Sequence, residues 1–396
     1  MLFPSLINWL AFLLITVIYW LLPPPRRLAW LAVTSLALLA FNDFLAALLV
    51  LYLLLLCALA QRALGLGHPR WRRILLLGAC LAPLVLLKYQ ALLGLDALQN
   101  AGALPLDFSA LAVPLGISYL TFKCLMFIVA AARASQPPCS LTALAAYLAF
   151  APAASSGPID PPQRLLKQLL SPARFDLDRL LYALYRIAMG VIFKFVLADT
   201  LAEVADSFSY GALAVSSTRL LAFGPYYGLK LYFDFAGYSH IAIGAGYLLG
   251  VKCMENFAAP LLKPNISEFW RSWHISLTSF LRSHIFQPCA YRWARRLGPQ
   301  RAAYAATFVA FLACGAWHGD GLNYLLWGAW HGLLLVLHQA FLRATRKRPL
   351  FRALRRQRWL ALPAWALTFA LVSLGWLLFA FTLEQLAYIF SHGAVQ

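Results

Sequence analysis

Apolar runs long enough to cross a lipid bilayer follow one another along almost the whole chain. Of its 396 residues, 62% are hydrophobic and 12% are charged, and the mean hydropathy is +0.72. A soluble domain carries charge on about a quarter of its residues. The runs are nearly all-apolar and do not alternate, which favours helices over the strands of a membrane barrel. The sequence therefore predicts an all-α polytopic membrane protein.

The runs predict roughly ten membrane spans. Segment 140–151 is too short to cross at about 1.5 Å per residue, so we expect it to be re-entrant. The apolar N-terminus has no basic region and no small-residue cleavage site, which indicates a retained first span. The expected spans are 5–22, 28–42, 44–61, 74–93, 111–132, 180–198, 218–250 (with glycine breaks), 302–317, 322–342 and 361–382.

Basic residues predict the orientation of the spans. The net charge is +19, but the bases cluster at the ends of apolar runs, which is typical of membrane insertion and not of nucleic-acid binding. The tract 343–358 is the most basic, and we expect it on the cytoplasmic side. The loops 94–110 and 199–217 are acidic and fit the outer side. The turn Gly319–Gly321 then faces outward, whereas the segment 263–301 lies on the inner side.

The pentapeptide GAWHG occurs twice, at Gly315–Gly319 and Gly328–Gly332. Ionisable groups inside a span are functional candidates, although a histidine there can also simply hydrogen-bond a neighbouring helix. The glycines permit close helix packing and equally the close approach of a ligand. His318 and His331 cannot share one face of a straight helix, so a metal site within one helix is excluded. With scattered cysteines and no CxxC pair, we expect no metal site and no disulfide framework.

A second segment, PNISEFWRSWHISLTSFLRSHIFQPC, begins at Pro264. Asn265 followed by Glu268 resembles a capping box, and Pro288 is expected to end the helix that begins there. This helix either lies on the cytoplasmic membrane surface, facing lipid phosphates, or lines a cavity. Its polar face is expected to carry Arg271, His274, Thr278 and Arg282.

A third segment, YFDFAGYSHIAIGAGYLLG, places Asp234 and His240 in a mainly apolar run. One interpretation is a glycine-packed helix pair in which Asp234 caps a broken helix end. The other is a polar path for a substrate.

Together these three segments resemble the membrane-bound O-acyltransferase family, in particular its bacterial branch of alginate O-acetyltransferases and D-alanyl transfer proteins of teichoic acid synthesis. Other segments resemble that branch in the same order: VPLGISYLTFK at Val113–Lys123, SGPID at Ser156–Asp160 and FKFVLADTLAEVAD at Phe193–Asp206. The resemblance implies a bundle of about eleven transmembrane helices with re-entrant segments and a central tunnel. It implies one integral-membrane domain, 1–396, with N-terminal helices (1–110), a catalytic core (111–342) and a basic cytoplasmic loop with the last helix (343–396).

The resemblance also implies site residues. His318 matches the near-invariant catalytic histidine of the family and His274 matches the other motif histidine, while His331 and Trp317 are secondary. The expected substrate-binding residues are Arg271, Trp273, Asn323, Asp234, Glu255 and Asn256. The chain departs from the family pattern at His240 (usually aspartate), Arg282–His284 (usually Arg-Asp-Tyr) and Pro288–Tyr291 (usually PLGG), which leaves the acyl donor open.

The implied reaction moves an acyl group, first of all acetyl, from a cytoplasmic thioester to a hydroxyl of a surface polysaccharide or a periplasmic acyl-accepting partner. His318 is expected to act as general base, because imidazole titrates near neutral pH. Asn323 and the backbone N–H groups of Gly319–Gly321 are expected oxyanion donors. His274 would act on the donor from the inner side, and Arg271 would contact a phosphate of the donor.

The donor is expected to be acetyl-CoA or an acyl-phosphopantetheine carrier protein, with no metal and no redox cofactor. We expect a bacterial inner-membrane, multi-pass acyltransferase that handles groups other than amino-acyl or D-alanyl. D-alanyl transfer from a carrier protein to a surface polymer is the close alternative. A polar-path transporter without acyl transfer, or a scaffold for a separate acyltransferase, would be a protein of another class.

Overall fold

The computed structural model describes residues 5–65, 67–90, 92–94, 113–171, 174–203, 217–354 and 357–392. Within these ranges the regular structure is entirely helical. Four of the described helices are long and apolar enough to cross a membrane, and they span Phe44–Ala63, Leu177–Glu203, Leu322–Thr345 and Arg358–Ala380. The predicted all-helical class is therefore confirmed. Most of the two expected outer loops, at 95–110 and 204–216, lies outside the described residues.

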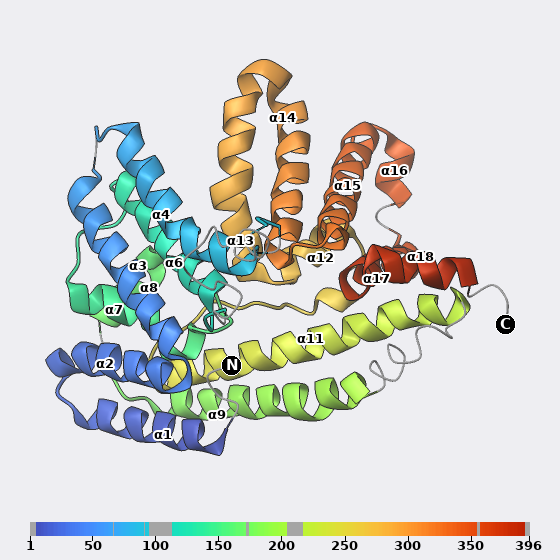
Figure 1. Ribbon diagram of the computed structural model, residues 1–396. Coiled ribbons are helices and arrows are strands. Elements are labelled where there is room, and N and C mark those ends of the chain that lie inside the picture. The colour runs from blue at the N-terminus through green and yellow to red at the C-terminus, as the bar shows by residue number, and fades with distance from the viewer. Residues whose placement is uncertain are drawn as a thin grey trace. The chain divides into compact units, whose positions relative to one another are not determined.

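The chain forms two compact units. Unit 1 comprises Met1–Gly190 with Tyr238–Met254, and unit 2 comprises Val191–Gly237 with Glu255–Gln396. Unit 1 contains α1 (Leu6–Leu21), α2 (Pro24–Asn42), α3 (Phe44–Ala63), α4 (Arg70–Lys88), α6 (Ile117–Ala132), α7 (Leu141–Ala149), the short η1 (Ala151–Ala153), α8 (Pro162–Leu170) and nearly all of α9 (Leu177–Val191) (Figure 1). The prediction of one integral-membrane domain stays a prediction.

Small and aliphatic side chains build the core of unit 1. Helix α3 packs against α6 and α7, and α2 packs against α7, with leucine and alanine filling most of the contacts. Cys57, Cys80 and Cys124 are buried in the same core, and all seven cysteines are free thiols. His240 also belongs to this unit, where its Nδ1 accepts a 2.9 Å hydrogen bond from Nε of the buried Arg186.

Unit 2 carries the remaining helices (Figure 1). They are η2 (Ile192–Ala198, a π-helix), the first two-thirds of α11 (Ser217–Leu248), η4 (Pro260–Leu262), α12 (Ile266–Ser272), α13 (Ile275–Leu281), η5 (Arg282–Phe286, a π-helix), α14 (Gln287–His318), α15 (Leu322–Thr345), α16 (Pro349–Leu354), η6 (Arg358–Leu360), α17 (Ala361–Ala380) and α18 (Leu383–His392).

The prediction that glycines break the span 218–250 is wrong, because α11 runs without interruption from Ser217 to Leu248. The glycines serve close packing. A Cβ added at Gly244 would lie only 2.8 Å from the carbonyl oxygen of Ala183, so this position lets α11 approach α9. Asp234, near the middle of α11, therefore caps no broken helix end.

Helix α14 folds back on itself. Gly298 has φ 75° and ψ 158°, a conformation that is open to glycine and strained for other residues, and Pro299 follows it. Figure 1 shows the two resulting arms lying side by side. The outgoing arm starts after His274 and the returning arm ends at His318. This hairpin, which the sequence did not predict, brings the two histidines to the same end of the structure.

Candidate active site

All ten predicted site residues lie in unit 2. One of them, His274, separates two helices of seven residues each, α12 and α13. Asn265 caps α12 as predicted: its Oδ1 accepts from the Glu268 backbone N–H at 2.9 Å, and its Nδ2 donates to Glu268 Oε1 at 2.7 Å. The helix then ends at Ser272, where a single helix up to Pro288 was expected. Pro288 instead lies in the first turn of α14, a position that proline tolerates well.

The break at His274 is held by buried polar contacts. His274 has φ 42° and ψ 56°, which is left-handed backbone that a histidine rarely adopts. The Asn256 carbonyl oxygen accepts from the Ile275 N–H at 2.9 Å, and Asn256 Oδ1 accepts from Ser276 Oγ at 2.6 Å. Asn256, predicted to bind substrate, is itself fully buried and fixes the chain around His274. Backbone strain of this kind is common at functional sites.

The break turns His274 into the interior, while Arg271 and Arg282 are exposed. The prediction that these residues share the polar face of one helix is therefore wrong for His274. Its ring packs edge-on against Phe235 (4.6 Å between centroids) and lies 6.3 Å from the Trp317 ring. The Nε2 atom is buried and has no hydrogen-bond partner among the described residues. Burial, and secondly the nearby His318, keep the pKa of His274 well below its usual value, so the imidazole is neutral at neutral pH.

His318 is the last residue of α14, and it remains partly exposed. Three aromatic rings surround it: Trp317 at 4.6 Å, Phe379 at 4.8 Å and Trp327 at 5.0 Å between centroids. The Nε1–H of Trp327 is buried without a hydrogen-bond partner in the described part of the chain. An accessible imidazole therefore lies beside two buried and unsatisfied ring nitrogens, those of His274 and Trp327.

His331, from the second GAWHG, has a different environment. It lies within α15 with 1% of its surface exposed. Its Nδ1 accepts a 3.3 Å hydrogen bond from Trp270 Nε1, and the Trp327 ring packs on it at 5.0 Å. Gly375 of α17 lies against the other nitrogen, because a Cβ there would come within 2.5 Å of Nε2. This histidine is enclosed by protein.

The glycines that open the two GAWHG copies pack on each other. A Cβ at Gly315 would lie 2.2 Å from the Tyr324 carbonyl oxygen, and one at Gly328 would lie 2.3 Å from the Phe311 carbonyl oxygen. Each built Cβ would also come within 3.2 Å of the other glycine's Cα. The repeat is thus the contact surface of α14 and α15, as expected for small residues between membrane helices.

The other predicted residues make contacts of their own. Asp234 forms an ion pair with Lys194, a residue that the sequence analysis passed over although it is a lone lysine in an apolar run. Asn323 is buried and its Nδ2 donates to the Leu378 carbonyl oxygen at 3.1 Å, which ties α15 to α17. Trp273 is buried and stacks on Phe269 at 5.4 Å, whereas Arg271 and Glu255 are exposed.

Sequence reasoning missed the aromatic walls of the site, chiefly Phe235, Phe379 and Trp327. Phe235 is part of the YFDF run, and Trp327 directly precedes the second GAWHG. The sequence does not show which neighbouring side chains an aromatic residue in an apolar run will contact. Among the described residues, no group of three or more His, Cys, Asp or Glu side chains is placed to hold a metal ion.

Comparison with known proteins finds a family that matches nearly the whole chain. The model of the membrane-bound O-acyltransferase family matches residues 5–380. A probable alginate O-acetylase of Pseudomonas syringae is 33% identical over 80% of this chain and 59% of its own length. A teichoic acid D-alanyltransferase of Bacillus subtilis is 31% identical over 67% of this chain and 68% of its own length. A peptidoglycan O-acetyltransferase of Helicobacter pylori is 29% identical over 68% of this chain and 54% of its own length.

The protein is a helical integral-membrane protein, and its candidate active site, which contains His318 and His274, lies in unit 2. The chain belongs to the membrane-bound O-acyltransferase family, because that family's model covers nearly all of it. The matches cover about three-fifths of the length of the alginate O-acetylases. The presence of D-alanyltransferases among the relatives removes the ground for excluding D-alanyl transfer.

Proposed function

We propose that this protein is an O-acyltransferase that moves an acyl group from a cytoplasmic thioester to a hydroxyl group on the far side of the membrane. One observation carries the proposal: a partly exposed imidazole, His318, ends a helix in a family of acyltransferases and lies beside the buried, neutral His274. The proposal extends the fold as well, to about eleven spans around a central tunnel in which donor and acceptor meet.

His318 acts as general base in this reaction. It removes the proton of the acceptor hydroxyl as that oxygen attacks the thioester carbonyl carbon. The tetrahedral intermediate then expels the thiolate: the C–S bond breaks, the new ester remains on the acceptor, and the proton passes to the departing sulfur. The aromatic rings around His318 keep water away from the thioester, which would otherwise be hydrolysed.

Hydrogen bonds to the oxyanion are the next requirement. The Trp327 Nε1–H and the neutral imidazole of His274 are the best-placed donors, because both nitrogens are buried without a partner among the described residues. The backbone N–H groups of Gly319–Gly321 are further candidates. Asn323 is a weaker one, since its amide already donates to Leu378.

The remaining predicted residues receive roles by position. Exposed Arg271 is suited to a phosphate of coenzyme A or of a phosphopantetheine arm. Trp273 forms an aromatic wall, and Asn256 positions His274 through the backbone. Asp234, Glu255 and the secondary His331 and Trp317 complete the surroundings. No metal or redox cofactor takes part in this scheme, and the expected location is the bacterial inner membrane.

Acetyl transfer to a polysaccharide or to a periplasmic acyl-accepting partner is the first choice of substrate pair. It is favoured by relatives named alginate O-acetylase and peptidoglycan O-acetyltransferase. D-alanyl transfer to a surface polymer is the second candidate, favoured by relatives named teichoic acid D-alanyltransferase.

A donor assay tests the proposal and separates these candidates. Membranes that contain the protein receive either radiolabelled acetyl-CoA or D-alanine loaded on its carrier protein, and the label in extracytoplasmic polymer and protein is counted. We expect label from one donor only, and none with His318→Ala or His318→Gln. Label transfer that persists in both variants removes the proposed mechanism. Solute export without acylation would instead identify a transporter.

A further inference from the structure

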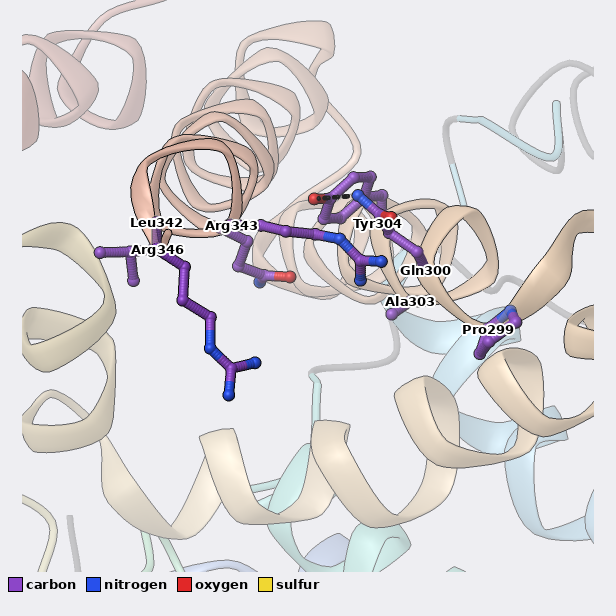
Figure 2. A pocket seen from close by; sticks show the side chains of 8 residues that line it. Pro299, Gln300, Ala303, Tyr304, Leu342, Arg343 and Arg346 are labelled. Atoms are coloured by element: carbon purple, nitrogen blue, oxygen red, sulfur yellow. Dashed lines mark hydrogen bonds between the residues drawn. The ribbon is translucent and has the colours of Figure 1, made fainter. Parts of the chain in front are cut away.

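A basic pocket lies at the end of the α14–α15 pair that is remote from His318. It has a volume of about 490 Å³ and is lined from α14 by Pro299, Gln300, Ala303 and Tyr304, and from α15 by Gln339, Leu342, Arg343 and Arg346. Figure 2 shows Arg343 extending toward the α14 side of the pocket and Arg346 extending into its open side. Gln300 Nε2 donates to Tyr304 Oη at 2.8 Å, which fixes both polar groups in the wall.

The charge of this region is one-sided. Between residues 269 and 383 the only acidic residue is Asp320, which lies at the other end of α14 and α15. Among the described residues no carboxylate lines the pocket, and no ion pair there joins Arg343 or Arg346. Two guanidinium groups beside a hydroxyl and two amides form a site for a phosphate oxyanion.

The position of the pocket along α15 indicates whether it suits the phosphate of a lipid or a free phosphate. Helix α15 is long and apolar enough to cross a membrane, and the pocket surrounds its last two turns. A helix of this length that spans a bilayer would bring these turns to the level of the lipid headgroups. Leu337 and Phe341 are exposed on the same helix, and Leu342 continues the apolar surface into the pocket itself. A ligand with a phosphate head and apolar chains can occupy both the basic pocket and the apolar face of α15 next to it. A free phosphate would occupy the pocket alone.

We propose that this pocket is a binding site for the phosphodiester headgroup of an anionic phospholipid, with the acyl chains lying along the exposed apolar face of α15. Basic pockets between helices on the cytoplasmic side are known to suit such headgroups. The site is distinct from the acyl-transfer centre at His318, and it does not depend on the proposed reaction. Its bound lipid would hold the α14 hairpin against the end of α15.

A simpler role must be separated from this one. Arginines at the end of a span also set its orientation, and they offset the partial negative charge of a helix C-terminus. Neither role requires the two guanidinium groups to share a cavity with Tyr304 and Gln300, and neither makes a preference for anionic lipids depend on this pocket. Arg295 and Arg296 are exposed, lie on α14 and do not line the pocket, so they provide a control with the same change of charge.

The experiment uses the full-length protein, stripped of lipid in a neutral detergent and titrated under native mass spectrometry. Phosphatidylglycerol and phosphatidylcholine with identical acyl chains are the probes, and coenzyme A and inorganic phosphate are added as competitors. We expect phosphatidylglycerol to bind more tightly, and R343Q/R346Q to weaken it by about tenfold or more. The R295Q/R296Q control should change its affinity by less than about threefold.

The variant A303F tests the cavity without changing any charge. Its ring should fill the space beside Ala303 and remove the preference for phosphatidylglycerol, and it replaces R343Q/R346Q as the test should that double variant not fold. Equal losses in R343Q/R346Q and R295Q/R296Q overturn the proposal, because only net charge would then matter. So does displacement of the lipid by coenzyme A at similar concentration, which would make the pocket a donor site. An unchanged lipid preference in A303F excludes the pocket as the location.

Discussion

The two copies of GAWHG have the same sequence but place their histidines in different environments. The first copy ends a helix, and His318 keeps part of its surface exposed beside unsatisfied ring nitrogens. The second copy lies inside α15, where Trp270 and Gly375 enclose His331. The difference comes from the position of each copy in its helix. Helix ends leave a side chain accessible, whereas the middle of a packed helix encloses it.

The largest expected effect separates the two histidines by function. Replacing His318 with alanine should lower acyl transfer by about 10²- to 10⁴-fold, the usual contribution of a general base. The melting temperature in detergent should barely change, because the ring is only partly buried. Replacing His331 with alanine should do the opposite: it leaves the buried Trp270 N–H without its acceptor and lowers the melting temperature.

Activity per folded molecule, measured after size-exclusion chromatography, checks this pair of variants. The distinction fails if His331→Ala loses as much activity per folded molecule as His318→Ala, since the buried copy would then take part directly in the chemistry.

The next effect tests the surface that the two copies share. Gly315→Ala places a Cβ about 2.2 Å from the Tyr324 carbonyl oxygen, and backbone atoms cannot move aside cheaply. We expect a loss of about 2–3 kcal/mol in the free energy of unfolding, or no folded protein at all. Gly78→Ala is the matched control, because that helical glycine has nothing within 4 Å of the added Cβ. Its melting temperature should stay equal or rise slightly.

Much of the fold follows from the apolar pattern of the sequence. Helices lie at the expected positions of most spans, and α1, α3 and α15 agree with their predicted ranges to within about three residues, the usual scatter of helix ends. The pattern failed to distinguish glycines that allow close helix packing from a glycine that reverses the chain. Gly244 packs inside an unbroken helix, whereas Gly298, which Pro299 follows in a basic stretch, reverses the chain.

The candidate site was foreseeable by residue type but not by arrangement. Periodicity placed His274 on the same polar helix face as Arg271, because the apolar spacing continues through the break at Trp273 and His274. The break depends on Asn256, whose carbonyl and side chain bond to residues about twenty positions away. Tertiary contacts of this kind leave no local signal, so a helix-period reading could not detect them.

A smaller effect tests whether His274 acts through its ring or only through its backbone. Asparagine tolerates left-handed backbone better than alanine does, so His274→Asn should be more stable than His274→Ala by about 1 kcal/mol. Both variants lack an imidazole, and both should lose acyl transfer to a similar degree, at least about tenfold. Thermal unfolding and initial rates of the two variants give the measurement. Full activity in His274→Asn would show that the bend alone matters.

The smallest expected effect concerns the hydrogen bond that holds the enclosed histidine. Trp270→Phe removes the N–H that donates to His331 Nδ1 and keeps an aromatic ring in contact with Phe311. The variant should lose about 1 kcal/mol of stability. In a double-mutant cycle with His331→Ala, the coupling energy should be about 0.5–1.5 kcal/mol, because each change removes the same Trp270–His331 hydrogen bond. A Gln300→Leu cycle with His331→Ala should show no coupling, since Gln300 bonds to Tyr304 instead. Coupling near zero between Trp270 and His331 would mean that packing against Gly375 and Trp327, and not the hydrogen bond, keeps the second histidine in place.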